Sequence, residues 1–151
     1  MAVLIFRVCL GGFFALAGTA KMGQPANLFA NQIKSLGILP NGWETPVAYV
    51  LPWIELVSGV FLFAGLFAKQ TTLLIGAQLA AFSVALAAAI GAGRAPEYCG
   101  CLPGVNETPV QALALDVLMI AWLVTSFRGL PGDLSLDGWL GGDVNTKNPP
   151  L

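Results

Sequence analysis

The stretch "VAYVLPWIELVSGVFLFAGLF", residues 47–67, is the clearest indication of the fold class in this sequence. It contains one charged side chain, that of Glu55, and it lacks the polar stripe that a soluble amphipathic helix carries. At about 1.5 Å per residue, a helix of this length is close to the thickness of the hydrocarbon core of a bilayer. The segment is therefore predicted to cross a membrane.

The rest of the chain repeats this pattern. The sequence is 56% hydrophobic and 10% charged, whereas a soluble domain has about 25% charged residues. Its mean hydropathy is +0.76. Further apolar segments of similar length span residues 2–20, 71–90 and 110–127. We therefore expect an all-α fold, an integral membrane four-helix bundle that has the lipid bilayer as its solvent.

Composition also excludes several classes of function. The net charge is −1 and no basic block is present, so nucleic acid is not an expected partner. The chain has no histidine, which excludes Ser-His-Asp and Cys-His catalysis, histidine-ligated haem and histidine-bound zinc. Any proton chemistry must use carboxylates, lysines, tyrosines, thiols or a bound cofactor.

The connections between the predicted spans differ in length. Residues 68–70 join the second and third spans so tightly that these must be antiparallel neighbours. The first long loop contains "PANLFANQIKSL", residues 25–36, and this pattern predicts a short amphipathic helix at the membrane surface. We divide the chain into a membrane domain, residues 1–128, and a Gly/Pro/Asp-rich tail, residues 129–151.

The distribution of basic residues favours one orientation in the cell membrane. With the N-terminus inside, four basic residues lie on the inner side and three on the outer side, which agrees with the positive-inside rule. Two closely spaced cysteines lie in the second long loop, and disulfides persist outside the cytoplasm. We expect both termini to be cytoplasmic, and both large loops, including Cys99 and Cys101, to be periplasmic or extracellular.

Four charged residues are predicted to gather on the outer side, namely Lys21, Glu55, Arg94 and Asp116. Helix geometry places Glu55 about 12 Å and Asp116 about 9 Å below that surface. Ionisable groups within a span usually face the protein interior and have partners. One interpretation is that Lys21–Glu55 and Arg94–Asp116 are structural ion pairs. The other is a polar pocket that relays protons or holds a quinone or a small oxyanion.

The stretch "APEYCGCLPG", residues 95–104, contains Cys99 and Cys101. Cα atoms two residues apart are separated by at most about 7 Å, so a disulfide needs a bent backbone and would be strained and easily reduced. This favours a redox pair, while a simple staple of the loop is the alternative. Two thiolates do not complete a zinc site, so no metal is expected unless a partner shares it. Cys9 is predicted to be a small core residue.

Several motifs together resemble the DoxX-like membrane family and its MauE-type branch. They are "RVCLGGFFALAGTAKM", "GILP", "LPWIELVSGVFLFAGLF" and "YCGCLPG". The family's Pro-x-x-Glu falls on Pro52 and Glu55, and its CGC on Cys99 to Cys101; Leu102 and Pro103 follow where the family usually has Phe-Gly. The resemblance implies a four-helix membrane protein with redox associations. MauE-type members are linked to disulfide handling during maturation of methylamine dehydrogenase, and other DoxX-like members to thiosulfate:quinone oxidoreduction.

Two hypotheses for function follow. The first is an oxidoreductase that transfers electrons between an extracytoplasmic partner and membrane quinone. Cys99 and Cys101 would be its redox pair, the four charges above would support them, and a quinone would be the cofactor. The second is a non-catalytic accessory subunit that stabilises a larger membrane redox or energy-converting complex. In both, the partners are other membrane or periplasmic redox proteins.

Overall fold

The computed structural model describes residues 2–95 and 108–127, and most of this part of the chain is helical. The helices are α1 (Ala2–Met22), α2 (Ala26–Leu36), α3 (Glu44–Ala64), α4 (Ala68–Gly91) and α5 (Pro109–Ser126). All except α2 are long and apolar enough to cross a membrane. The predicted all-α fold with four spans is confirmed, and the short helix lies in the first long loop, as expected.

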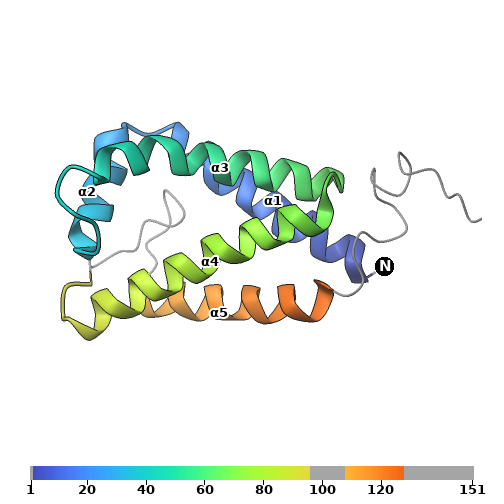
Figure 1. Cartoon of the computed structure of the whole chain (residues 1–151). Coiled ribbons are helices and arrows are strands. Elements are labelled where there is room, and N and C mark those ends of the chain that lie inside the picture. Colours follow the sequence, from blue (N-terminus) through green and yellow to red (C-terminus); the bar gives the residue numbers. More distant parts are fainter. Residues whose placement is uncertain (1, 96–107, 128–151) are drawn as a thin grey trace, which may run out of the picture.

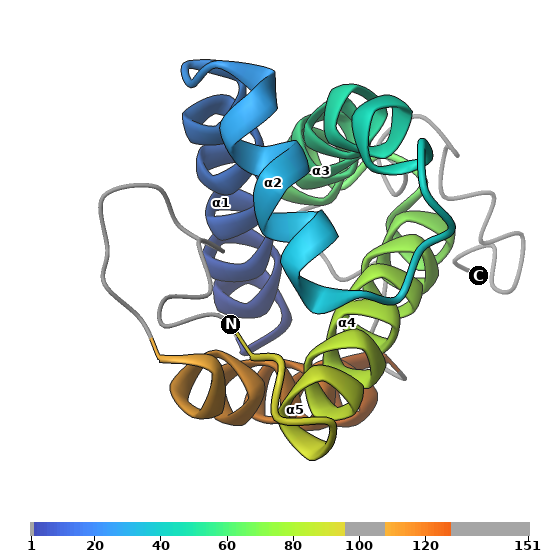
Figure 2. The same ribbon diagram turned by 90° about the vertical axis from the view of Figure 1, so that its left-hand side faces the viewer.

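The four long helices form an antiparallel bundle (Figure 1). In this bundle α1 packs most extensively on α3, α3 contacts α4, α4 contacts α5, and α5 returns to α1. Because the chain reverses direction from one long helix to the next, both long connections begin and end at the same end of the bundle. Helix α2 lies across that end and packs on α3, with smaller contacts to α4 and α1 (Figure 2).

The second span was predicted over residues 47–67, whereas α3 begins and ends three residues earlier, at Glu44 and Ala64. Helix α3 ends at Ala64 because Gly65 adopts a left-handed conformation, with φ of 74°, and its N–H bonds to the carbonyls of Phe61 and Leu62. Residues 68–70, which were predicted to be the connection, instead form the first turn of α4. Leu66, Phe67 and Ala68 continue the apolar run past Gly65, so hydropathy alone did not mark the end of α3.

Small residues bring the backbones of α1 and α3 into contact. A Cβ atom at Gly11 would lie 2.6 Å from the backbone nitrogen of Phe63, and one at Gly18 would lie 2.7 Å from the carbonyl oxygen of Pro52. A Cβ atom at Gly59 would meet the backbone of Ala15. Close approach at small residues is a main source of helix association in bilayers. It fixes the position of the end of α1 relative to the middle of α3.

The core between the long helices is apolar, and so is much of the outer surface. Phe6 is fully buried and meets the Trp122 ring edge-on, with 5.4 Å between ring centroids. Large apolar side chains such as Leu16 and Val84 are about two-thirds exposed, as expected for helices that face lipid. Cys9 is exposed on this outer surface. The prediction that Cys9 belongs to the core is therefore wrong, because both faces of a spanning helix are apolar.

Arg7 lies at the end of the bundle away from α2. It is buried, its Nε–H donates to the carbonyl oxygen of Leu62 at 3.4 Å, and its guanidinium lies directly under Gly65. The carbonyls of the last helical turn carry partial negative charge, so a cation is favourable there. Arg7 thus stabilises the C-terminal end of α3.

Candidate functional site

A buried ion pair joins α1 to α3. Lys21 comes from the last turn of α1, and its Nζ lies 2.6 and 2.8 Å from the two carboxylate oxygens of Glu55 in the middle of α3. Both side chains are 4% exposed. The structural ion pair predicted for these two residues is therefore present. An ammonium held by both oxygens of a carboxylate forms strong, charge-assisted hydrogen bonds.

The remaining helices complete the surroundings of this pair. The Lys21 ammonium lies 5.2 Å from the ring centroid of Phe29 in α2 and 5.3 Å from that of Phe82 in α4. Both distances are typical of cation–π contacts. Asp116 of α5 lines the same small cavity as Lys21 and Glu55, of about 40 Å³. All five helices therefore contribute a side chain to this cluster.

The other predicted ion pair is not formed. Asp116 is half-buried and accepts a long hydrogen bond, 3.5 Å, from the Ser83 hydroxyl. Arg94 is exposed, and its guanidinium lies against Gly37 at the end of α2: a Cβ atom at Gly37 would be 3.2 Å from Arg94 Nη1. Arg94 follows α4 by three residues in a turn and faces α2, whereas Asp116 faces the interior of the bundle.

The contact between Arg94 and Gly37 fixes the start of the second long loop. Gly37 has a left-handed conformation and caps the C-terminal end of α2, which is the negative end of the helix dipole. The loop ends at Thr108, whose side chain accepts from the backbone N–H of Gln111 while the Gln111 side chain accepts from the N–H of Thr108. This capping box defines where α5 begins. Cys99 and Cys101 lie between these anchors, outside the described residues.

A second polar contact in the bundle was not predicted from the sequence. Gln78 of α4 is 8% exposed, and its Nε2 donates to Ser58 Oγ at 3.3 Å and to the carbonyl oxygen of Leu74 at 3.4 Å. Ser58 Oγ in turn donates to the carbonyl oxygen of Ile54 at 2.6 Å. A glutamine within a span was the available signal, because polar side chains in bilayers usually face other helices.

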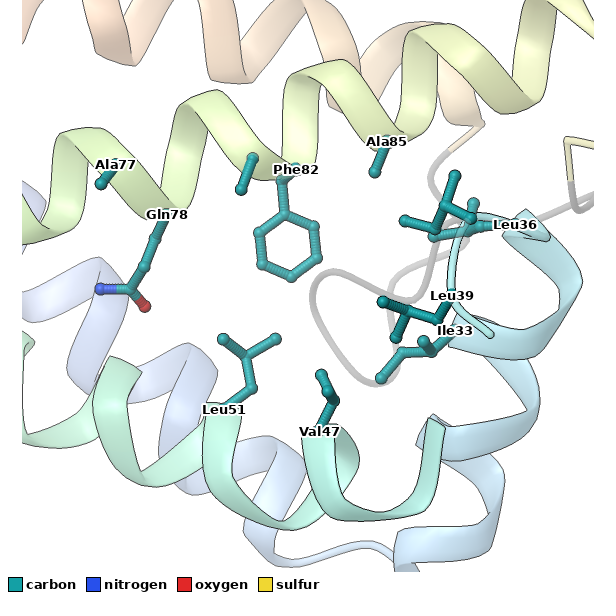
Figure 3. Close-up of a pocket in the computed structure, with 11 residues that line it drawn as sticks. Ile33, Leu36, Leu39, Val47, Leu51, Ala77, Gln78, Phe82 and Ala85 are labelled. Carbon is teal, nitrogen blue, oxygen red and sulfur yellow. The ribbon is translucent and has the colours of Figure 1, made fainter. Parts of the chain in front are cut away.

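Gln78 also lines an apolar pocket between α2, α3 and α4. The pocket has a volume of about 360 Å³, within the range of small-molecule sites. Figure 3 shows Val47 and Leu51 of α3 on one side, Phe82 of α4 on the other, and α2 at one end. Gln78 is the only polar side chain among the described residues that line it.

These features define an all-α integral membrane protein with four spans and a short helix across one end. A buried ion pair lies where the helices meet. The first 128 residues match the family described as methylamine utilisation protein MauE, and the chain belongs to this family. Comparison of the chain with curated proteins and with solved structures gave no match. The MauE-type resemblance is thereby confirmed, while the wider DoxX-like resemblance stays a prediction.

Proposed function

We propose that this MauE-family protein passes electrons from the thiols of an extracytoplasmic partner to a quinone in the membrane, through Cys99 and Cys101. The observation that carries the proposal is the spacing of these cysteines in a loop whose two ends are fixed. A disulfide between residues so close in sequence is strained, and strained disulfides are the oxidising and labile ones. The loop begins and ends at the same end of the bundle as α2.

The electron transfer has two balanced steps. In the first, a thiolate of the partner attacks the Cys99–Cys101 disulfide, and a second partner thiol then releases the mixed disulfide. The partner gains a disulfide, and Cys99 and Cys101 become thiols. In the second step, the two thiols lose two electrons and two protons, which reduce a quinone to a hydroquinone and restore the disulfide.

The charged residues have different roles in this proposal. Lys21 is held by Glu55 and contacts two aromatic rings, so its role is to position helices. Arg94 is exposed and lies five residues before Cys99. A cation near a thiol favours the thiolate, which is the reactive form. Arg94 is therefore the residue that supports exchange.

Trapping of mixed disulfides tests the proposal. In cells, a Cys99→Ser or Cys101→Ser variant is expected to accumulate a disulfide-linked adduct with an extracytoplasmic protein. The remaining thiolate can attack the disulfide of the oxidised partner, which is the reverse of the first step, and no neighbouring thiol is then present to release the mixed disulfide. Replacing both cysteines should abolish the adduct. Cys9→Ser is the matched control and should trap nothing, because Cys9 lies on the lipid-facing surface. An adduct that persists in the double variant would rule out this pair as the exchange site.

A second function, an accessory subunit of a larger membrane complex, is supported by the Lys21–Glu55 cluster. A buried ion pair that contacts several helices is a fixed element of a scaffold, and its side chains are not accessible to a substrate. The double cysteine variant distinguishes the two functions. If the double cysteine variant still sustains growth on methylamine and co-purifies with the same membrane proteins, the accessory role is favoured.

A further inference from the structure

Gln78 lines the pocket between α2, α3 and α4, and its amide has one polar atom without a hydrogen-bond partner among the described residues. We propose that the pocket binds a lipid-soluble hydroquinone, one of whose hydroxyl groups donates a hydrogen bond to Gln78 Oε1. Gln78 Oε1 is buried and accepts no hydrogen bond from any residue that the structure describes. A buried acceptor without a donor lowers the stability of the folded protein, because its lost hydrogen bonds to water are not replaced. In Figure 3 the Gln78 amide lies at one end of the pocket with its oxygen on the side of Leu51.

The hydrogen bonds of Gln78 fix the orientation of its amide. The carbonyl oxygen of Leu74 can only accept, so the amide nitrogen must face it. Ser58 uses its own proton toward the carbonyl oxygen of Ile54 and accepts the second proton of Gln78 Nε2. Both donors of the amide are therefore occupied. Gln78 offers a ligand an acceptor and nothing else.

This restriction selects the chemistry of the ligand. An acyl chain has no hydrogen-bond donor, and the oxidised quinone has carbonyl groups that only accept. A hydroquinone has two hydroxyl groups, either of which can donate to Gln78 Oε1. The pocket should therefore bind the reduced form more tightly than the oxidised form.

The remaining walls suit a planar ring with an apolar substituent. Phe82 projects into the pocket from α4, opposite Val47 and Leu51 of α3 (Figure 3). An aromatic ring packs favourably against another in an offset or edge-on arrangement. Ile33 of α2 lines the opposite end from Gln78. This places the pocket at the end of the bundle that carries the cysteine loop.

The choice of a hydroquinone among ring molecules with a hydroxyl group rests on the proposed electron transfer to quinone. A net hydrogen bond of ordinary strength corresponds to about a tenfold preference for the reduced form. For a two-electron couple, a tenfold preference raises the reduction potential of the bound quinone by about 30 mV. The site would therefore favour quinone reduction by the Cys99 and Cys101 thiols.

Thermal unfolding of the full chain in lipid nanodiscs tests the site. Under anaerobic conditions, a decyl-substituted benzohydroquinone should raise the unfolding temperature in a concentration-dependent way, since a ligand of the native state stabilises it. The matching quinone should act only at about tenfold higher concentration. Gln78→Met should weaken hydroquinone binding about tenfold. Gln70→Met, the same change at an exposed position of the same helix, should leave it unchanged.

Other outcomes would overturn the site. Equal effects of quinone and hydroquinone, or unchanged hydroquinone binding in Gln78→Met, would show that Gln78 does not recognise a donor. If Gln78→Met itself fails to fold, Ala81→Trp provides the second test, because Ala81 lines the pocket and a large side chain there should block binding. Binding and thiol trapping together separate the two proposals. Gln78-dependent hydroquinone binding combined with no mixed-disulfide adduct of either single-cysteine variant keeps the site and removes the proposed function.

Discussion

The Lys21 ammonium lies 2.6 and 2.8 Å from the two carboxylate oxygens of Glu55, and this contact joins the end of α1 to the middle of α3. An isolated charge within a span is costly, whereas two opposite charges that are hydrogen-bonded to each other can be retained. Phe29 and Phe82 close the site from α2 and α4. The pair therefore specifies how four of the helices meet.

Breaking this pair from one side should destabilise the bundle. Glu55→Gln leaves the Lys21 ammonium buried without its counter-charge, and the free energy of unfolding should fall by about 3–5 kcal/mol. Unfolding by denaturant in detergent micelles would measure the loss. The double variant Lys21→Met, Glu55→Met should recover most of it, because neither charge then remains. Wild-type stability in Glu55→Gln, or a double variant less stable than either single one, would contradict this role.

Two adjacent glycines of α1 should respond differently to the same substitution. A Cβ atom at Gly11 would lie 2.6 Å from the backbone nitrogen of Phe63, so Gly11→Ala must move α1 away from α3 and should cost about 1–3 kcal/mol. At Gly12 the nearest atom would be 4.0 Å away. Gly12→Ala should therefore be neutral or gain up to about 1 kcal/mol of helix propensity. Thermal unfolding of the two variants measures the difference, and equal effects would exclude close α1–α3 packing.

Labelling with a membrane-impermeant maleimide should place the two ends of the bundle on opposite sides of the membrane. In a chain whose only cysteine is Cys99, intact cells or spheroplasts should be labelled from outside. In a chain whose only cysteine is a substituted Lys69→Cys, at the start of α4, labelling should require permeabilisation. Labelling of Cys99 only after permeabilisation would reverse the proposed orientation and exclude exchange with an extracytoplasmic partner.

The arrangement of spans was predictable because hydropathy and length alone define them. The Lys21–Glu55 pair was also predictable, since few opposite charges lie within the spans on the same side. Helix ends were less predictable: α3 ends at Ala64 within a continuous apolar run, and only the left-handed conformation of Gly65 marks that end. The exposure of Cys9 was not predictable, because a lipid-facing residue and a core residue have the same character.

The pocket could not be predicted from the sequence. It depends on how α2 folds back over α3 and α4, which apolar spacing does not specify. Gln78 was visible as a polar residue, but its significance comes from two donors that are used by Ser58 and Leu74 and one acceptor that is not. Which hydrogen-bonding groups of Gln78 have partners depends on the packing of the helices, which the sequence does not specify.

The stoichiometry of quinone reduction by the purified chain tests the proposed electron transfer most directly. The reduced, full-length protein in nanodiscs is mixed anaerobically with decyl-substituted benzoquinone, and hydroquinone is measured together with the Cys99–Cys101 disulfide by alkylation and mass spectrometry. The proposed electron transfer requires one hydroquinone for each disulfide formed, with Cys9→Ser unchanged and the Cys99→Ser, Cys101→Ser variant inactive. Absence of hydroquinone, or equal quinone reduction by the double variant, would contradict it.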